Sequence, residues 1–147
     1  MAELKPLVVE YKRESDEVHC LTIDSKALPA IRIDYSGLPP AERGGTASQL
    51  LCASAAFCVA ATFATALAGR GATINSMTAR GVLEQDRDES RRLKVARIRV
   101  EVEVDVEPKD IETFEKCRRI MRHGCLVGYS LQQGIEVQEV FRRAGES

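Results

Sequence analysis

The sequence predicts an α+β fold built as a single domain over residues 1–147. Two observations lead to this class. Runs of strand-type residues occur on both sides of one long stretch without charged residues, and the elements neither alternate strictly between strand and helix nor consist of strands alone. The expected order is β-β-β-α-β-β-α-α-β. A chain of 147 residues fits one domain with one hydrophobic core.

The first part of the chain is expected to form three strands, over residues 7–12, 18–23 and 30–35. The polar residues 14–17 separate the first two as a hairpin turn would. Residues 30–35 alternate between apolar and polar side chains, which is typical of a half-buried strand. Gly37 and the Pro39-Pro40 pair then end the strand pattern, and a loop is expected to extend to Gly45.

Residues 46–69 predict a helix at the centre of the fold. This stretch is rich in Ala and contains no charged residue. A helix that is apolar on every face lies in a protein core or crosses a membrane. Several Ser and Thr residues dilute the stretch, and Ala predominates over Leu and Ile, so we expect a core helix. Gly69-Arg70-Gly71 is a helix-ending signal.

The second part of the chain predicts two strands, two helices and a last strand. Residues 72–84 and 93–106 are the strands, with a charged turn at 85–91. From Val100 to Val106 the residues alternate strictly between Val and an acidic residue, so one face packs and the other meets solvent. Helices are expected from Glu107 to about His123 and over 125–133. Residues 135–141 alternate again and predict the final strand.

Composition and charge exclude several classes of function. The net charge is −1, aromatic residues make up 5% of the chain and Trp is absent, so neither a global basic field nor a base-stacking surface predicts nucleic-acid binding. The first ten residues lack the basic start and long apolar run of a signal peptide. We therefore expect a cytoplasmic protein, a compartment in which structural disulfides are rare.

Five cysteines in such a chain need an explanation. An odd number excludes a disulfide framework that uses all of them, and no CxxC spacing or His-rich cluster predicts a zinc site. Cys20 and Cys117 fall among apolar residues of a strand and a helix, which favours a core position. The five thiols are thus inert core residues or include a reactive pair.

Cys58 and Cys125 are the two candidates for that pair. Cys58 lies in the middle of the charge-free helix, where the pattern alone favours a small core residue over a functional thiol. Cys52 precedes it by six residues, about 240° around a helix, so at most one of the two faces a given site. Cys125 follows Gly124 at a predicted helix N-terminus, which favours a thiolate, and His123 would add to this effect. An ordinary capping thiol is the alternative.

Two segments resemble the central motifs of the OsmC/Ohr family, the osmotically inducible and organic-hydroperoxide-resistance proteins. Thr46-Ala-Ser-Gln-Leu-Leu-Cys-Ala-Ser-Ala-Ala-Phe-Cys58 is similar to the helix that carries the family's peroxidatic cysteine. Cys125-Leu-Val-Gly-Tyr-Ser-Leu, followed by Gly134-Ile-Glu-Val137, resembles the motif of the resolving cysteine. The expected element order matches as well, so the resemblance covers nearly the whole chain.

This resemblance implies a role for each thiol and an intertwined homodimer. Cys58 would be the peroxidatic thiol and Cys125 the resolving thiol of a peroxidase that acts on organic hydroperoxides. The first thiolate would become a sulfenate, the second would condense with it to a disulfide, and an external dithiol would restore both. No metal or flavin cofactor is implied. Leu51, Phe57 and Phe63 are expected to supply an apolar lining for an alkyl tail.

The chain departs from the family pattern at the start of the central helix. There the hydroperoxide-resistance branch has an acidic residue that holds an Arg beside the peroxidatic cysteine. Ser48 takes that position here, Gln49 follows it, and neither is charged. Arg32 and Arg43 are the candidate arginines, although each would equally fit a solvated position. Leu126 replaces the usual Pro after the second cysteine.

These departures indicate a divergent OsmC-like branch and leave two other functions open. A dimer of this fold could bind a small hydrophobic ligand without catalysis. The thiol pair could also cycle as a redox sensor without turnover.

Overall fold

The computed structural model describes residues 3–134, 138 and 142, and the chain divides into two compact units. The first unit spans Met1–Gly45 and the second spans Thr46–Ser147. The described helices and strands follow the order β1, β2, β3, α1, β4, β5, α2, α3, so the fold is of the mixed α+β class. The last predicted strand, residues 135–141, lies outside the described residues apart from Gln138. The single domain over 1–147 stays a prediction.

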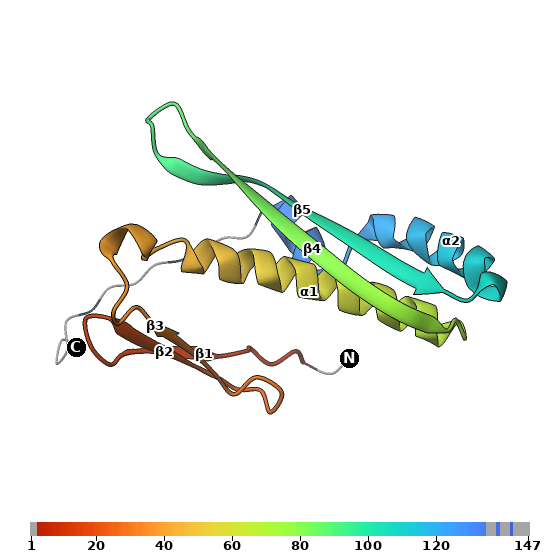
Figure 1. The fold of residues 1–147 in the computed structure, drawn as a ribbon, viewed down its shortest axis with the longest axis horizontal. Helices are drawn as coiled ribbons and strands as arrows, with labels where there is room; N and C mark the ends of the chain where they lie inside the picture. Colours follow the sequence, from red (N-terminus) through yellow and green to blue (C-terminus); the bar gives the residue numbers. More distant parts are fainter. Residues whose placement is uncertain (1–2, 135–137, 139–141, 143–147) are drawn as a thin grey trace. The chain divides into compact units, whose positions relative to one another are not determined.

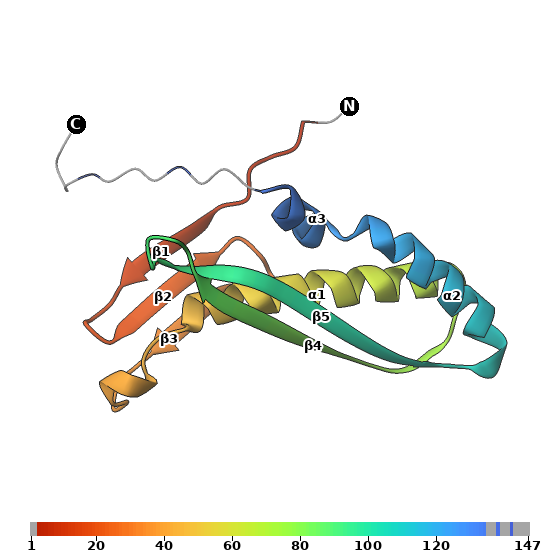
Figure 2. The ribbon, with the colours of Figure 1, turned by 90° about the horizontal axis from the view of Figure 1, so that it is seen from above.

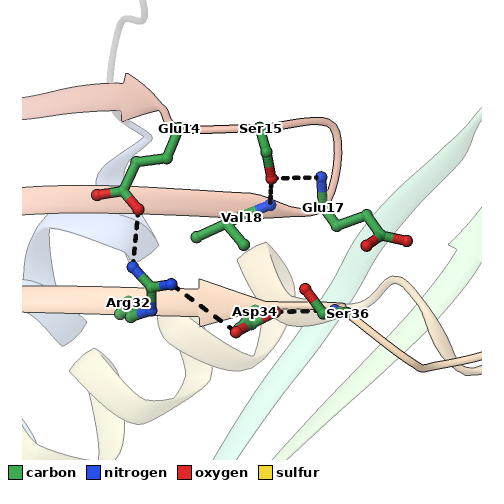
Figure 3. A network of polar contacts seen from close by, with 7 residues as sticks. All are labelled: Glu14, Ser15, Glu17, Val18, Arg32, Asp34 and Ser36. Carbon is green, nitrogen blue, oxygen red and sulfur yellow. Dashed lines mark hydrogen bonds and ion pairs between the residues drawn. The ribbon is translucent and has the colours of Figure 1, made fainter.

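The first unit is a three-stranded antiparallel sheet. Its strands are β1 (Val9–Arg13), β2 (Val18–Ile23) and β3 (Ala30–Asp34), in the order β1-β2-β3. The predicted strands lie within two residues of these bounds. Figure 3 shows the turn between β1 and β2, where the Ser15 hydroxyl accepts hydrogen bonds from the amides of Glu17 (3.2 Å) and Val18 (3.1 Å). A short 3-10 helix, η1 (Pro40–Glu42), follows the sheet.

Helix α1 (Thr46–Gly69) opens the second unit with the bounds that the sequence predicted. Its C-terminus has the Schellman arrangement. The amide of Ala72 donates to the carbonyl of Leu67 at 3.1 Å, and the amide of Gly71 donates to that of Ala68 at 3.0 Å. Gly71 has φ 79°, a conformation that glycine adopts without the cost borne by other residues. This explains why the helix ends here although its composition favours continuation.

Strands β4 (Ile74–Arg87) and β5 (Leu93–Val106) form a long antiparallel hairpin. The turn lies where the charged residues 85–91 predicted it, but it begins three residues later, because β4 continues to Arg87. It forms around Asp88, whose carboxylate accepts hydrogen bonds from the amides of Ser90 (2.9 Å) and Arg92 (2.8 Å). The charged side chains of β4 are compatible with a strand because they point into solvent from a two-stranded ribbon.

Two helices follow the hairpin. A 3-10 turn, η2 (Pro108–Asp110), leads into α2 (Ile111–Ile120). The 3-10 turn η3 (Met121–His123) then precedes α3 (Leu126–Gln133). Asp110 is buried, and its carboxylate accepts a hydrogen bond from the amide of Thr73 at 2.9 Å. This bond ties the start of α2 to the connection between α1 and β4.

The core of the second unit lies between α1, the hairpin and α2. Phe63 and Leu67 of α1 are buried together with Cys117 of α2, and Leu67 and Cys117 have no exposed surface. Phe63 meets Phe114 edge to face, with ring centroids 5.5 Å apart. Figures 1 and 2 show α1 lying along the hairpin, with α2 beside the C-terminal half of α1. The predicted core position of Cys117 is confirmed.

One stretch among the described residues, Pro40–Gly69, is long and apolar enough to cross a membrane, with a mean hydropathy of 2.0. Length and composition do not separate a membrane span from the central helix of a water-soluble domain. Within this stretch Phe63 and Leu67 contribute to the core of the second unit. Ala55, Phe63 and Leu67 are the buried residues of α1, and 17% of its most apolar window is buried, so the helix packs on the core of the second unit along one side only.

Candidate active site

The structure brings Cys58 and Cys125 together within the second unit. Cys58 lies midway along α1, and Cys125 is the N-cap residue of α3. Both thiols are reduced; Cys125 is buried, with 4% of its surface exposed, and Cys58 is half-buried. Because α1 and α3 pack against each other, the start of α3 faces the middle of α1 (Figure 2). Helix packing therefore joins two residues that are 67 positions apart in the sequence.

The sulfur of Cys58 lies in a set of hydrogen-bond donors. The amide of Val127 donates to it at 3.5 Å. The thiol of Cys125, the hydroxyl of Thr62 and the amide of Gly128 also lie close enough to this sulfur to lower its pKa. Val127 and Gly128 belong to the first turn of α3, whose amides have no partner within the helix. The Cys58 sulfur is thus held at the positive end of a helix.

These donors determine which of the two thiols ionises first. Burial raises the pKa of the Cys58 thiol, but the hydrogen bonds from Cys125, Val127, Thr62 and Gly128 together hold that pKa below its ordinary value. Burial also raises the pKa of Cys125. The hydrogen bond between Cys125 and Cys58 raises this pKa further, and so does the negative charge of an ionised Cys58. Cys58 is therefore the first of the two thiols to lose its proton as the pH rises, and Cys125 keeps its proton longer.

This distribution of charge reverses one sequence-based prediction. The position of Cys125 at a helix N-terminus predicted a thiolate there, with His123 as a contributor. The amide of Gly128 does donate to the Cys125 sulfur, at 3.3 Å. The neighbouring Cys58 sulfur shares these amides, however, and its negative charge opposes a second one beside it. His123 is not among the groups that shift the pKa of Cys125.

A groove of about 590 Å³ runs along α3. Most of its lining is apolar and comes from three elements: Leu51, Ala55 and Val59 of α1, Val95 and Val100 of β5, and Leu131 of α3. Arg97 and Gln132 add polar groups. Neither cysteine lines the groove, but Gly128, whose amide donates to the Cys125 sulfur, does, so the groove and the thiol pair share this residue.

The sequence predicted the apolar lining only in part. Leu51 lines the groove as expected, but Phe63 lies in the core and Phe57 is 75% exposed. On a helix that is apolar all round, the pattern does not show which side meets the strands. The predicted lining residues therefore fall on different faces of α1.

The four candidate supporting residues occupy two places. Ser48 and Gln49 lie in the first turn of α1, about 15 Å and 13 Å along the axis from Cys58 at 1.5 Å per residue. Arg32 and Arg43 belong to the first unit, where each already binds a carboxylate. Arg32 pairs with Glu14 at 2.7 Å and with Asp34 at 3.9 Å (Figure 3), and Arg43 pairs with Glu17 at 2.7 Å.

The donors to Cys58 are the part of the site that sequence reasoning missed. Val127 and Gly128 act through their backbone amides, which leave no mark on side-chain chemistry. The available signal was the predicted helix start at Cys125, because a helix start always presents unpartnered amides. Thr62 lies one turn after Cys58 on α1, and its hydroxyl could have been suspected from that spacing.

The remaining cysteines lie elsewhere. Cys52 faces β4, where a Cβ atom at Gly81 would lie 2.8 Å from its sulfur, so it does not share the site of Cys58. Cys20 lies on β2 of the first unit, opposite Arg32. Within the part of the chain that the structure describes, no three His, Cys, Asp or Glu residues gather as a metal site would require.

The second unit thus combines a charge-free helix, a cysteine at the midpoint of that helix and a second cysteine that caps a later helix, an arrangement typical of a thiol protein. The comparisons identify the family. Residues 40–140 match the model of the OsmC-like protein family, and the chain belongs to that family. No curated protein matches the chain.

Two solved structures share the fold. An OsmC-like protein of unknown function from Vibrio cholerae O1 biovar eltor superposes with a TM-score of 0.61 at 16% identity, over 86% of this chain and 92% of that one. A hypothetical protein from Aquifex aeolicus VF5 superposes with a TM-score of 0.57 at 17% identity, over 84% of this chain and 85% of that one. The resemblance read from the two cysteine motifs is thereby confirmed at the level of family and fold.

Proposed function

We propose that this protein is a thiol-dependent peroxidase that reduces organic hydroperoxides with Cys58 and Cys125. The observation that carries the proposal is the unequal pair of thiols. The pKa of Cys58 lies below its ordinary value, and the pKa of Cys125 lies above it. A peroxidase of this type needs a thiolate nucleophile beside a thiol that stays protonated until the first step is complete.

The proposed cycle has three steps. The Cys58 thiolate attacks the distal oxygen of the hydroperoxide, so that an S–O bond forms, the O–O bond breaks and the alcohol leaves after taking up a proton. Cys58 is then a sulfenic acid. The Cys125 sulfur attacks the Cys58 sulfur, a disulfide forms and water leaves. An external dithiol reduces the disulfide and restores both thiols by exchange.

The positive end of α3 takes the place of a cation in this proposal. A buried thiol needs a stabilising group in order to ionise, and the amides of Val127 and Gly128 supply one. Arg32 and Arg43 remain candidate supporting residues. If the helix amides suffice, replacing either Arg by Ala should change the rate of Cys58 oxidation by less than about tenfold, a difference of about 1.4 kcal/mol in activation free energy.

The groove beside the pair favours organic hydroperoxides over hydrogen peroxide. Burial of each methylene of an alkyl tail contributes roughly 0.8 kcal/mol, whereas hydrogen peroxide has no apolar part to bury. Leu51, Val59 and Leu131 supply the contacts. Within a series of primary alkyl hydroperoxides, the rate should therefore rise with chain length until the groove is filled.

The decisive experiment is mass spectrometry after one equivalent of an alkyl hydroperoxide. The wild-type protein should lose two hydrogens and give a Cys58–Cys125 disulfide in peptide maps. Cys125→Ser should instead retain an oxidised Cys58 that a sulfenate-specific probe labels. Cys52→Ala serves as the matched control and should behave as wild type. If both thiols stay reduced while the hydroperoxide persists, the proposal is wrong.

The groove also supports a second function, binding of a small hydrophobic ligand without catalysis. Its apolar lining and volume of about 590 Å³ fall within the range of ligand sites. A ligand that co-purifies, together with thiols that do not react, would favour this function. A redox sensor would form the disulfide but would not consume peroxide continuously with a dithiol present, and steady-state assays separate that behaviour from a peroxidase.

We further propose that the protein works in the cytoplasm as a homodimer. The exposed apolar surface of α1 supports the dimer, since Phe57 is 75% exposed on a helix without a charged residue. Sedimentation analysis should give twice the monomer mass, and Phe57→Glu should shift the equilibrium towards the monomer. A wild-type protein that remains monomeric at high concentration would contradict the proposal.

A further inference from the structure

A hollow beside helix α2 is lined almost entirely by basic side chains. It has a volume of about 380 Å³ and lies in the second unit. Four of its six lining residues are Arg or Lys, the fifth is His and the sixth is Ile: Arg70, Lys116, Arg119, Arg122, His123 and Ile120. No acidic residue lines it. The whole chain has a net charge of −1, so this excess of positive charge is confined to one part of the protein.

The secondary structure explains how these side chains meet. Lys116, Arg119 and His123 follow the helical spacing of three and four residues, since η3 continues the turn of α2. Arg122 comes from η3 as well. Arg70 directly follows α1, whose C-terminal half lies beside α2 (Figure 2). Two separate elements therefore contribute positive charge to one hollow.

The basic side chains of the hollow differ from other arginines of the same unit in their partners. Arg97, Arg99 and Arg118 each pair with a carboxylate, at Glu84, Glu101 and Glu115. Among the residues that the structure describes, Arg119 and Arg122 have no such partner. Lys116 approaches Glu112 only at 3.8 Å, and both side chains are exposed.

The helix dipole does not account for this much charge. Basic residues at the C-terminus of a helix balance a partial charge of about −0.5. The hollow holds four formal positive charges, so this partial charge and the Glu112 carboxylate near Lys116 still leave at least two of them without a counter-charge. Like charges in one hollow repel one another, and a bound anion removes that repulsion.

We propose that this hollow binds a small organic molecule through a diphosphate or triphosphate group. Arg119 and Arg122 offer planar forks of donors that match phosphate oxygens, and Lys116 and Arg70 add charge. Ile120, 43% exposed, gives the organic part an apolar contact. The scarcity of aromatic residues and the small extent of the basic surface argue against nucleic acid as the ligand.

The hollow lies next to the thiol pair in sequence. Arg122 and His123 immediately precede Gly124 and Cys125, so a ligand held there contacts the segment that carries the N-cap of α3. The inference does not depend on the proposed peroxidase function, because it concerns binding and is tested by binding alone.

Calorimetric titration of the reduced full-length chain with inorganic pyrophosphate tests the proposal. Saturable binding with one site per chain is expected. Replacing both Arg119 and Arg122 by Gln should weaken it by at least about tenfold, whereas Arg118→Gln should change it by less than about twofold. Arg118 is the matched control because it lies on the same helix, pairs with Glu115 and does not line the hollow. Equal thermal stability of the variants shows that each is folded.

Three results would overturn the proposal. The first is a titration in which pyrophosphate does not saturate the protein at low ionic strength. The second is an Arg118→Gln variant that weakens binding as much as the double variant does, which would indicate a general effect of net charge. The third is binding of duplex DNA or of vesicles containing phosphatidylserine that pyrophosphate does not compete with, which would assign the basic surface to a macromolecule or a membrane.

Discussion

The amide of Val127 donates a hydrogen bond to the sulfur of Cys58 at 3.5 Å, across the contact between α3 and α1. The bond places the midpoint of an uncharged helix at the positive end of another helix. In consequence Cys58, the less buried thiol, loses its proton first, and Cys125, the more buried thiol, keeps its proton longer. The predictions below follow from this arrangement and from the close contacts around it.

Cys125→Ala should raise the pKa of Cys58. The Cys125 thiol is a donor to the Cys58 sulfur, and a donor to the charged form lowers the pKa, so its removal acts in the opposite direction. The thiolate fraction rises with pH through the pKa. The pH profile of Cys58 alkylation by iodoacetamide should therefore move to higher pH in the variant, and the rate at pH 7 should fall.

Cys52→Ala is the control for this experiment, because Cys52 faces β4 and is not a donor to Cys58. Its profile should coincide with that of the wild type. A profile that moves to lower pH in Cys125→Ala would mean that Cys125 acts mainly as a competing negative charge.

Gly128→Ala should slow the formation of the disulfide. A Cβ atom at this position would lie 3.3 Å from the Cys125 sulfur, closer than such contacts usually are, so the sulfur must move by a few tenths of an ångström. Ala in a helix is otherwise favoured over Gly by roughly 0.5–1 kcal/mol, so the variant should fold at least as well as the wild type. Stopped-flow measurement of disulfide formation after a hydroperoxide pulse gives the rate.

Gln133→Ala, at the exposed end of α3, provides the comparison for a change in helix propensity alone. A wild-type rate in Gly128→Ala would show that the position of the Cys125 sulfur does not limit the reaction.

The sequence predicted the helices and strands around this site and its two cysteines, but not the groups that lower the pKa of Cys58. The bounds of α1 and β5 follow from a charge-free run and a strict alternation, two patterns that side chains carry in full. The family motifs identified Cys58 and Cys125. The donors to Cys58 could not be predicted in the same way, because Val127 and Gly128 act through backbone groups that every residue except Pro possesses.

The sequence also could not predict which side of the apolar helix α1 each side chain lies on. Phe57, Phe63 and Leu51 are equally apolar, yet one is exposed, one lies in the core and one lines the groove. Only packing against the β4–β5 hairpin, α2 and α3 separates them. The turn was predicted to begin three residues too early for a related reason, since the pattern of charges marks solvent exposure and both turns and ribbon strands are exposed.

Gly81→Ala should destabilise the second unit, and Cys52→Ala should remove that effect. The new Cβ atom would lie 2.8 Å from the Cys52 sulfur, a distance at which the Cys52 side chain, the strand or the helix must shift. Overpacking of this kind costs about 1–3 kcal/mol in the free energy of unfolding. The next contacts, with Ala56 at 3.4 Å and the carbonyl of Cys52 at 3.5 Å, are tolerable, so Gly81→Ala combined with Cys52→Ala should unfold close to Cys52→Ala alone.

Urea denaturation of the two single variants and the double variant gives the coupling energy between the positions. Additive free energies would contradict the contact. They would imply that the cost at position 81 comes from the strand backbone.

Leu126→Pro should preserve the site and stabilise the fold. Leu126 is the first helical residue of α3, a position at which the amide has no helical partner and Pro is favoured. The preceding residue, Cys125, has φ −96° and ψ 171°, within the extended region that a following Pro requires. The Leu side chain is 80% exposed, so little packing is lost. A Pro that fits the native backbone raises the free energy of unfolding by about 0.4–1 kcal/mol, chiefly because it restricts the unfolded chain.

Urea denaturation should therefore give a higher midpoint for Leu126→Pro, and hydroperoxide should still produce the Cys58–Cys125 disulfide at the wild-type rate. Leu126→Ala separates loss of the side chain from the effect of the ring, and it should leave the midpoint nearly unchanged. A lower midpoint for Leu126→Pro than for Leu126→Ala would mean that the amide of Leu126 has a partner in the folded protein. In that case a Pro could not be accommodated at position 126 without a change in the first turn of α3.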